Sequence, residues 1–206
     1  MKTLAARNGA LDYAILFYLI SFWGWCTETI LFLVRWGKLA DRGFLTLPFC
    51  AIYGTAVLAV HFLLGTPQKG KLAPLFDRAS ALPRGKKGAA QAGVFALYFL
   101  LACLPPALLE LAVGVGFRSA LHVRLWDYGY QKFQLFGSVS LSFTFLWGGL
   151  ITLGMATAWE PLREYVRSLP RTFKRAAVTS LTVCVLADLA FNLIYLLVTG
   201  SHLKLF

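Results

Sequence analysis

Charge is scarce in this chain. Only 14% of its 206 residues are Asp, Glu, Lys or Arg, whereas an average soluble protein has about 25%. Hydrophobic residues make up 58% of the chain, and the mean hydropathy is +0.67. So few charges cannot keep so apolar a surface in water. The composition therefore excludes a soluble globular domain and indicates that a lipid bilayer surrounds much of the chain.

Signatures of catalysis and of metal binding are missing as well. The four cysteines stand singly in or beside apolar runs, and the three histidines do not have a metal-ligand spacing. No GxSxG or HExxH motif occurs. Residues 65–71 have the spacing of a phosphate-binding loop, but Leu72 stands where a Ser or Thr should hold magnesium. The sequence predicts no metal, no cofactor and no ATPase activity within this chain, and it leaves open whether the protein is an enzyme.

Five apolar segments follow one another along the chain. A membrane-spanning helix needs roughly 20 apolar residues, and these segments are near that length. The sequence therefore predicts an all-α, polytopic membrane helix bundle with about five transmembrane helices in a single membrane domain, residues 1–206. The predicted spans are roughly 11–34, 48–64, 89–113, 137–158 and 176–199.

Two basic loops, residues 65–88 and 159–175, separate these spans. The first contains three prolines and is expected to be irregular. Thirteen Lys and Arg residues fall in the N-terminus and these two loops, and seven fall on the other side. Because Lys and Arg are enriched in short cytoplasmic loops, we predict a multi-pass protein of the plasma membrane with its N-terminus in the cytoplasm and its C-terminus outside. The net charge of +11 would then face anionic lipid and not nucleic acid.

Three acids lie inside predicted spans: Glu28, Glu110 and Asp188. Ionisable side chains at membrane depth are rare, and they face a bundle interior or a wet cavity. Asn192 follows Asp188 by four residues, so both belong to one helical face. Pro105 and Pro106 precede Glu110 and are expected to bend their helix. A broken helix beside a buried acid is typical of a transport site, although a kink that only improves packing is the alternative.

Opposite charge is expected close to these acids. Arg42 and Arg124 each follow an acid by 14 residues, in predicted outer loops, and can pair with Glu28 and Glu110. Asp127 stands between Trp126 and Tyr128, whose rings are suited to the membrane interface. Such a cluster predicts either a site for a cationic or polyhydroxyl group or a network of structural salt bridges.

Short motifs in this order resemble the bacterial "putative ABC-transporter type IV" (CmpB-like) family of membrane proteins. The resemblance covers roughly residues 11–158. It is carried by Glu28, Arg42-Gly43-Phe44-Leu45, Pro48, Ile52-Tyr53-Gly54, Glu110, Trp126-Asp127-Tyr128, Phe133, Gly137 and Trp147-Gly148. The resemblance implies a multi-pass transporter permease that works with a separate ATPase subunit. So small a permease would also have to form a homo-oligomer.

Three hypotheses follow. The first is a membrane transport component with an outward-facing site that binds substrate or relays protons. Its candidate residues are Glu28, Arg42, Glu110, Arg124 and Asp127, with Asp188 and Asn192 deeper and with Gly43, Pro48, Tyr53, Gly54, Trp126 and Tyr128 in support. The second is a membrane-embedded enzyme or binding protein for a lipid headgroup at the outer leaflet. The third is an accessory subunit whose acids form structural ion pairs.

Overall fold

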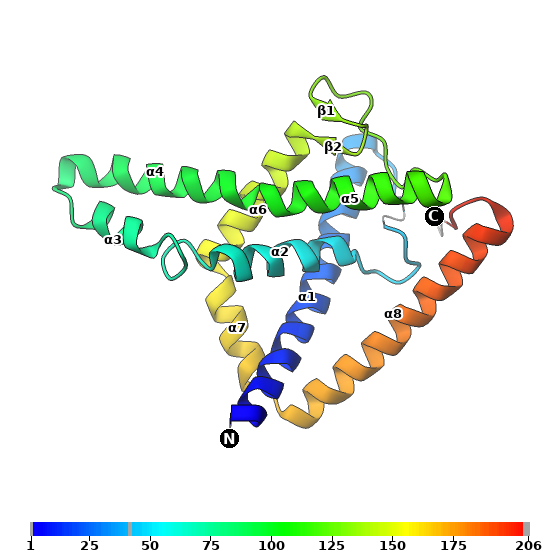
Figure 1. The fold of residues 1–206 in the computed structure, drawn as a ribbon, viewed down its shortest axis with the longest axis horizontal. Helices are drawn as coiled ribbons and strands as arrows, with labels where there is room; N and C mark the ends of the chain where they lie inside the picture. The colour runs from blue at the N-terminus through cyan, green and yellow to red at the C-terminus, as the bar shows by residue number, and fades with distance from the viewer. Residues whose placement is uncertain (1, 41–42, 204–206) are drawn as a thin grey trace. The chain divides into compact units, whose positions relative to one another are not determined.

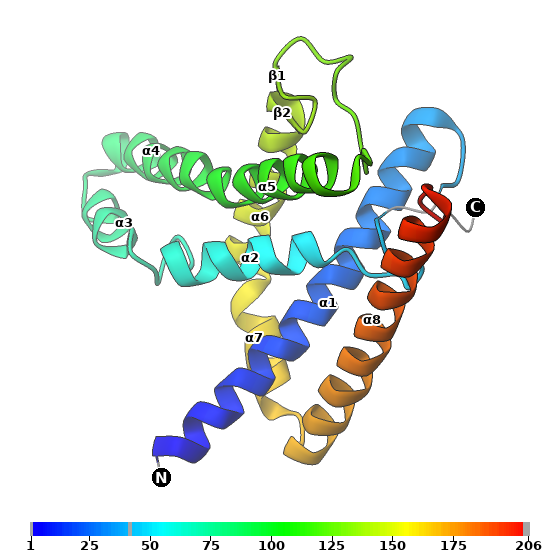
Figure 2. The same ribbon diagram turned by 45° about the vertical axis from the view of Figure 1, so that its right-hand side comes forward.

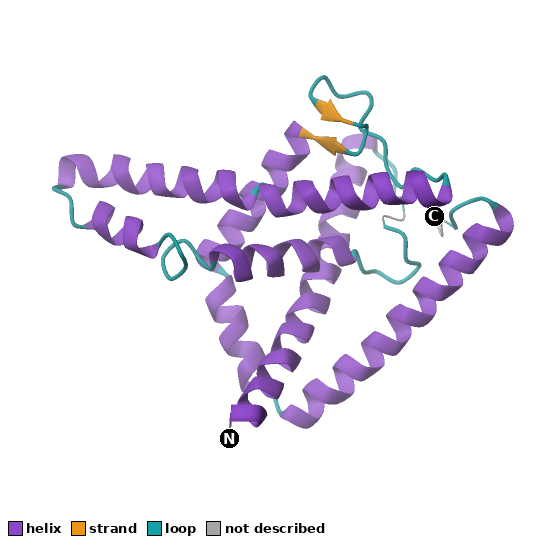
Figure 3. Cartoon of the chain, viewed as in Figure 1, coloured by secondary structure: helices purple, strands orange, loops and turns teal. Residues whose placement is uncertain are grey.

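Helices dominate the computed structural model, which describes residues 2–40 and 43–203 (Figures 1 and 3). Two short strands form one antiparallel hairpin, in which Gln134 pairs with Ser140 and Leu135 with Val139. The strands are β1 (Gln134–Leu135) and β2 (Val139–Ser140). The helices are α1 (Lys2–Trp36), α2 (Ala51–Leu64), α3 (Ala73–Ser80), α4 (Arg84–Ala102), α5 (Leu104–Leu121), α6 (Leu141–Thr157), α7 (Trp159–Ser168) and α8 (Arg171–Thr199).

Three or four of these helical segments are long and apolar enough to cross a bilayer. The three are Gly9–Trp36, Arg84–Leu121 and Arg171–Thr199, and α6 with α7 makes a fourth if this pair, bent by 60°, is one span. The 14 residues of α2 extend over about 21 Å, which is less than the ~30 Å hydrocarbon core. The expectation of several membrane helices is confirmed, and a count of five stays a prediction.

The proline pair does not bend its helix by more than 40°. Pro105 and Pro106 lie in the first turn of α5, where the missing N–H groups have no intrahelical partner to lose. Helical structure is interrupted only at Cys103, and α4 and α5 continue as one apolar stretch of 38 residues. The pronounced bend lies instead between α6 and α7.

Two further segments differ from expectation. Residues 65–88 are partly helical, because α3 and the first turn of α4 fall within them, while residues 65–72 and 81–83 are irregular as expected. The predicted span 137–158 begins outside a helix: Gly137 and Ser138 lie in the hairpin, and α6 begins at Leu141. The sequence pattern missed the hairpin because its strands are only two residues long and alternation needs about four residues to be visible.

The chain forms two compact units. Unit 1 comprises residues 1–55, 116–125 and 165–206, and unit 2 comprises residues 56–115 and 126–164. In unit 1, α1 packs against α8. Asp12 meets Lys174 and, farther along both helices, Tyr18 meets Thr182. Because both positions increase together, α1 and α8 run parallel, as Figure 2 shows.

Unit 2 is built around α4, which packs against α3 and α6. Gly148 of α6 permits the close approach to Cys103 at the α4–α5 break, since a Cβ at Gly148 would lie 3.2 Å from Cys103 Cα. Trp126 holds the hairpin, because its indole Nε1–H donates to the Ser138 carbonyl at 2.7 Å. A small residue at a helix crossing is the packing role expected for membrane helices.

Candidate functional site

A short connector, residues 43–50, links α1 to α2 in unit 1. Gly43 has φ +107°, a backbone conformation open mainly to glycine. The Phe49 N–H donates to the Leu47 carbonyl at 2.7 Å, which makes a three-residue turn centred on Pro48. The next residue, Cys50, donates its N–H to the Ser21 carbonyl of α1 at 3.0 Å. The family-motif residues Gly43 and Pro48 therefore shape the path of the connector.

Asp188 of α8 binds this connector. One of its carboxylate oxygens accepts a hydrogen bond from the Thr46 hydroxyl, and the other accepts the Leu47 N–H at 3.0 Å. The Asn192 side-chain amide donates to the same carboxylate at 3.0 Å, as their spacing on one helical face predicts. All these donors are neutral, and no basic side chain pairs with Asp188 in the described part of the chain.

Glu28 of α1 binds the first turn of α2 and lies close to Cys50, the last residue of the connector. The Tyr53 hydroxyl donates to Glu28 Oε2 at 2.9 Å, and the thiol of Cys50 lies 4.0 Å from the same oxygen. Gly54 lets the start of α2 approach α1, because a Cβ there would lie 2.6 Å from the Phe17 carbonyl oxygen. Two acids from two apolar helices thus bind the connector and the first turn of α2 that follows it. We call Glu28, Thr46, Tyr53, Asp188 and Asn192 the polar site.

Buried polar groups in the same helices add to this pattern. The hydroxyl oxygens of Ser21 and Thr29 on α1 and the Asn192 side-chain carbonyl have no hydrogen-bond partner among residues 9–40 and 43–203. Ser21 and Asn192 are 0% and 1% exposed. Buried polar groups in native structures are nearly always satisfied, so unsatisfied ones call for an explanation such as a bound molecule.

The remaining predicted site residues do not belong to the polar site, and one of them, Arg42, is not among the residues that the structure describes. Arg124 is exposed in unit 1. Glu110 is buried in α5 of unit 2. Asp127 is exposed, and its carboxylate accepts the Gly129 N–H at 2.7 Å, while Tyr128 stacks on Phe143 at 4.9 Å. Pairing of the acids with Arg42 and Arg124 stays a prediction.

A buried ion pair was missed by the sequence reading. Lys174 Nζ of α8 lies 2.6 Å from Asp12 Oδ1 of α1, and it also donates to the Val166 and Arg167 carbonyls at 3.3 Å. Lys174 therefore binds the last carbonyls of α7, which a helix leaves without internal partners. The available signal was Asp12 itself, an acid in the first turn of a predicted span.

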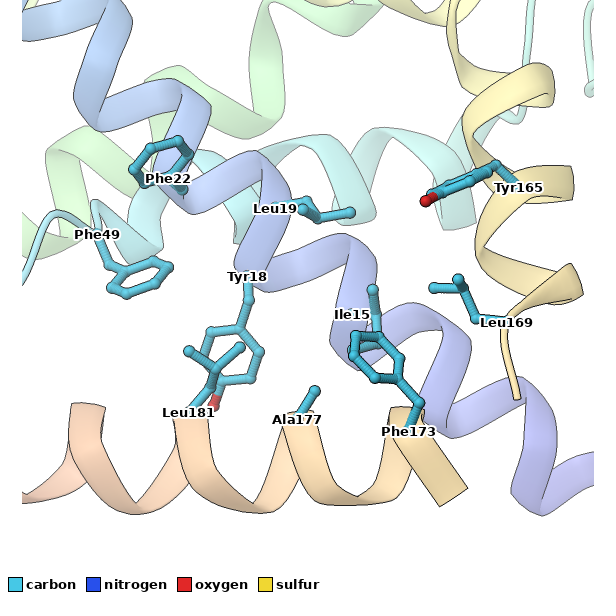
Figure 4. A pocket seen from close by; sticks show the side chains of 10 residues that line it. All are labelled: Ile15, Tyr18, Leu19, Phe22, Phe49, Tyr165, Leu169, Phe173, Ala177 and Leu181. Atoms are coloured by element: carbon cyan, nitrogen blue, oxygen red, sulfur yellow. The ribbon is translucent and has the colours of Figure 1, made fainter. Parts of the chain in front are cut away.

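An apolar cleft of about 340 Å³ lies in unit 1 between α1, α8 and the end of α7. Figure 4 shows Ile15 and Tyr18 facing Phe173, Ala177 and Leu181 across it, with Leu19 pointing towards Tyr165. Both facing sets recur at helical spacing, so each belongs to one face of its helix. The small side chain of Ala177 leaves room between larger neighbours.

The sequence profile of the family described as "Putative ABC-transporter type IV" matches residues 15–193. The chain belongs to this family. No curated protein and no solved structure matches the chain. The match to this family spans Glu28, the connector and Asp188, so the whole polar site lies within the part of the chain that the family shares. The family expected from the motifs is confirmed, and it makes the protein a multi-pass membrane protein.

Proposed function

We propose that this protein is the permease subunit of a transporter and that its polar site binds a cationic solute or relays protons. The observation that carries the proposal is Asp188. This acid lies in an apolar candidate span and has three neutral hydrogen-bond donors, with no described basic partner. A carboxylate in such surroundings is costly unless a cation or a proton balances its charge.

The connector offers a way to link two helices to the occupant. Glu28 and Asp188 come from α1 and α8, and both hydrogen-bond within residues 46–53. A change in the charge or position of either acid would therefore alter the hydrogen bonds of the same backbone segment. Ser21 and Asn192 supply buried oxygens that a cation or a water molecule would satisfy. The predicted residues Arg42, Glu110, Arg124 and Asp127 remain candidates on their charge alone.

The family description supports transport, and transport of that class needs a separate ATPase. The basic segments 65–88 and 159–175, with α3 and α7 inside them, are the surfaces we propose for docking the ATPase. A permease of 206 residues would work as a homo-oligomer. Exposed apolar side chains on α8, among them Leu197 and Val198, leave surface for lipid or for a second copy.

The parallel arrangement of α1 and α8 supports an odd number of crossings. If both helices span the bilayer in the same direction, an odd number of spans must lie between them. Four spans in total would make them antiparallel, whereas five would not. We therefore propose five crossings in the plasma membrane, with α2 as the second, the N-terminus in the cytoplasm and the polar site in the outer half.

Co-purification tests the partner. The protein is extracted from native membranes in mild detergent, and bound proteins and lipids are identified by mass spectrometry. We expect an ATPase subunit. Recovery of no ATPase would contradict the permease proposal and favour an accessory role, whereas a lipid retained by wild type and lost in Glu28→Gln would favour the headgroup hypothesis.

Uptake tests the site. Membrane vesicles energised with ATP are offered a defined mixture of inorganic and organic cations, and proton movement is followed with a pH-sensitive dye. We expect Glu28→Gln and Asp188→Asn to abolish ATP-dependent uptake or proton movement without unfolding. Lys38→Gln is the control, since Lys38 is exposed and lies outside both the polar site and the proposed docking segments. Wild-type flux in both site variants would refute the role of the acids.

A further inference from the structure

The apolar cleft of unit 1 lies between two helices that belong to the bilayer by composition. Its walls are α1 and α8, both candidate spans, and the end of α7 closes one side. Its volume of about 340 Å³ is at the lower end of the range for small-molecule pockets. In such surroundings hydrocarbon is the solvent, so an apolar cleft would be filled by lipid tails.

Two tyrosines line the cleft, and the hydroxyl of one of them, Tyr18, is paired within unit 1. Tyr18 and Thr182 share a hydrogen bond of 2.8 Å between their hydroxyl oxygens. What remains towards the cleft is almost entirely carbon, from Ile15, Phe22 and Leu181 among others. This lining suits a saturated chain and offers a polar solute very little to bind.

Three arginines flank one end of the cleft in the sequence. Leu169 and Phe173 line this end, and Arg171, the first residue of α8, lies between them in the sequence. Arg167 and Arg175 are each four residues from Arg171. None of the three arginines forms an ion pair with a residue in the described ranges. The Arg171 Nε is buried and has no described hydrogen-bond partner.

The fourth basic residue of this segment, Lys174 of α8, is neutralised by Asp12. The excess positive charge of the segment that flanks this end of the cleft therefore comes from the arginines. Arginine is suited to phosphate, because its planar fork can donate two hydrogen bonds at once. This segment lies on the side predicted to be cytoplasmic, where anionic lipids attract basic residues.

We propose that the cleft binds one anionic phospholipid of the bilayer, with an acyl chain between α1 and α8 and the phosphate at Arg167, Arg171 and Arg175. The bound lipid would wedge the two helices apart on the cytoplasmic side of the polar site. The proposal is independent of the transported solute, and it holds equally for an accessory subunit.

Native mass spectrometry tests this binding. The purified protein is equilibrated with vesicles of equal phosphatidylglycerol and phosphatidylcholine, returned to detergent and weighed with its retained lipid. We expect one phospholipid on each protein, enriched in phosphatidylglycerol. Ala177→Trp fills the cleft and is expected to abolish retention. The control is Val183→Trp on the same helix, at a side chain that is 61% exposed and outside the cleft.

Arg171→Gln tests the contribution of the lipid headgroup to binding separately from that of the acyl chain. One arginine near a membrane surface changes the binding of an anionic lipid by about fivefold, so the preference for phosphatidylglycerol should fall by that factor while one lipid is still retained. This variant leaves the cleft unfilled. It therefore still tests the proposal if Ala177→Trp does not fold. Equal retention of the two lipids by wild type would overturn the proposal, as would equal loss in Ala177→Trp and Val183→Trp.

Discussion

Lys174 Nζ and Asp12 Oδ1 lie 2.6 Å apart in a buried ion pair that joins α8 to α1. Their side chains are 5% and 11% exposed, so water contributes little to stabilising either charge. The same ammonium group binds two carbonyls at the end of α7. One side chain thus ties three helices together at the end of unit 1 where α7 meets α8.

Asp12→Ala should destabilise the protein by about 3 kcal/mol, because it leaves Lys174 buried without its counter-charge. The double variant Asp12→Leu, Lys174→Met should recover much of that loss. Unfolding in detergent micelles, followed by circular dichroism, measures both. Arg163→Met is the comparison, since the pair with Glu160 is partly exposed and should contribute less than about 1 kcal/mol. An Asp12→Ala effect as small as this would contradict the role given to the pair.

Tyr53→Phe should lower stability by about 2 kcal/mol, because it removes the hydroxyl that donates to Glu28 while keeping the ring. Tyr195→Phe is the matched control: Tyr195 lies on α8, and no described residue hydrogen-bonds its hydroxyl. Thermal unfolding of the two variants side by side gives the difference. Equal midpoints would show that the Tyr53–Glu28 hydrogen bond contributes nothing to holding α2 on α1.

Gly54→Ala should destabilise by about 1–3 kcal/mol, because the added methyl would meet the Phe17 carbonyl oxygen at 2.6 Å and push α2 from α1. Gly154→Ala should do the reverse. Its Cβ would have nothing within 4 Å, and alanine is favoured over glycine in a helix by about 1 kcal/mol. Chemical unfolding of both variants checks the opposite signs. A stabilised Gly54→Ala protein would rule out a tight α1–α2 contact at this position.

Cysteine labelling should place Lys38 and Arg84 on opposite sides of the membrane if α2 crosses it. In a background without the four native cysteines, Lys38→Cys should react with an impermeant maleimide on intact cells. Arg84→Cys should react only after permeabilisation. Both positions are exposed in the structure. Labelling of both from outside would reduce the number of crossings to three, since α1 and α8 would remain parallel.

The polar site shows which functional residues could be predicted from the sequence and which could not. Glu28, Asp188 and Asn192 were found because an acid inside an apolar run is conspicuous, and the Asp188–Asn192 contact follows from four-residue helical spacing. Thr46 and Tyr53 could not be assigned their partners in the same way. Thr46 meets an acid 142 positions away and Tyr53 one 25 positions away, and no local pattern encodes such pairs. The Lys174–Asp12 pair, 162 positions apart, escaped for the same reason.

The sequence by itself determined that the chain is helical, apolar and a member of this membrane-protein family, because composition and periodicity are local and every long apolar run became a helix. Only the tertiary structure decided how those helices pack and which of their side chains make contact. It set α1 parallel to α8, bound two distant acids to the connector and the first turn of α2, and opened a cleft at Ala177. These outcomes depend on which side chains meet across helices, and packing chooses those meetings only when all the helices are present together.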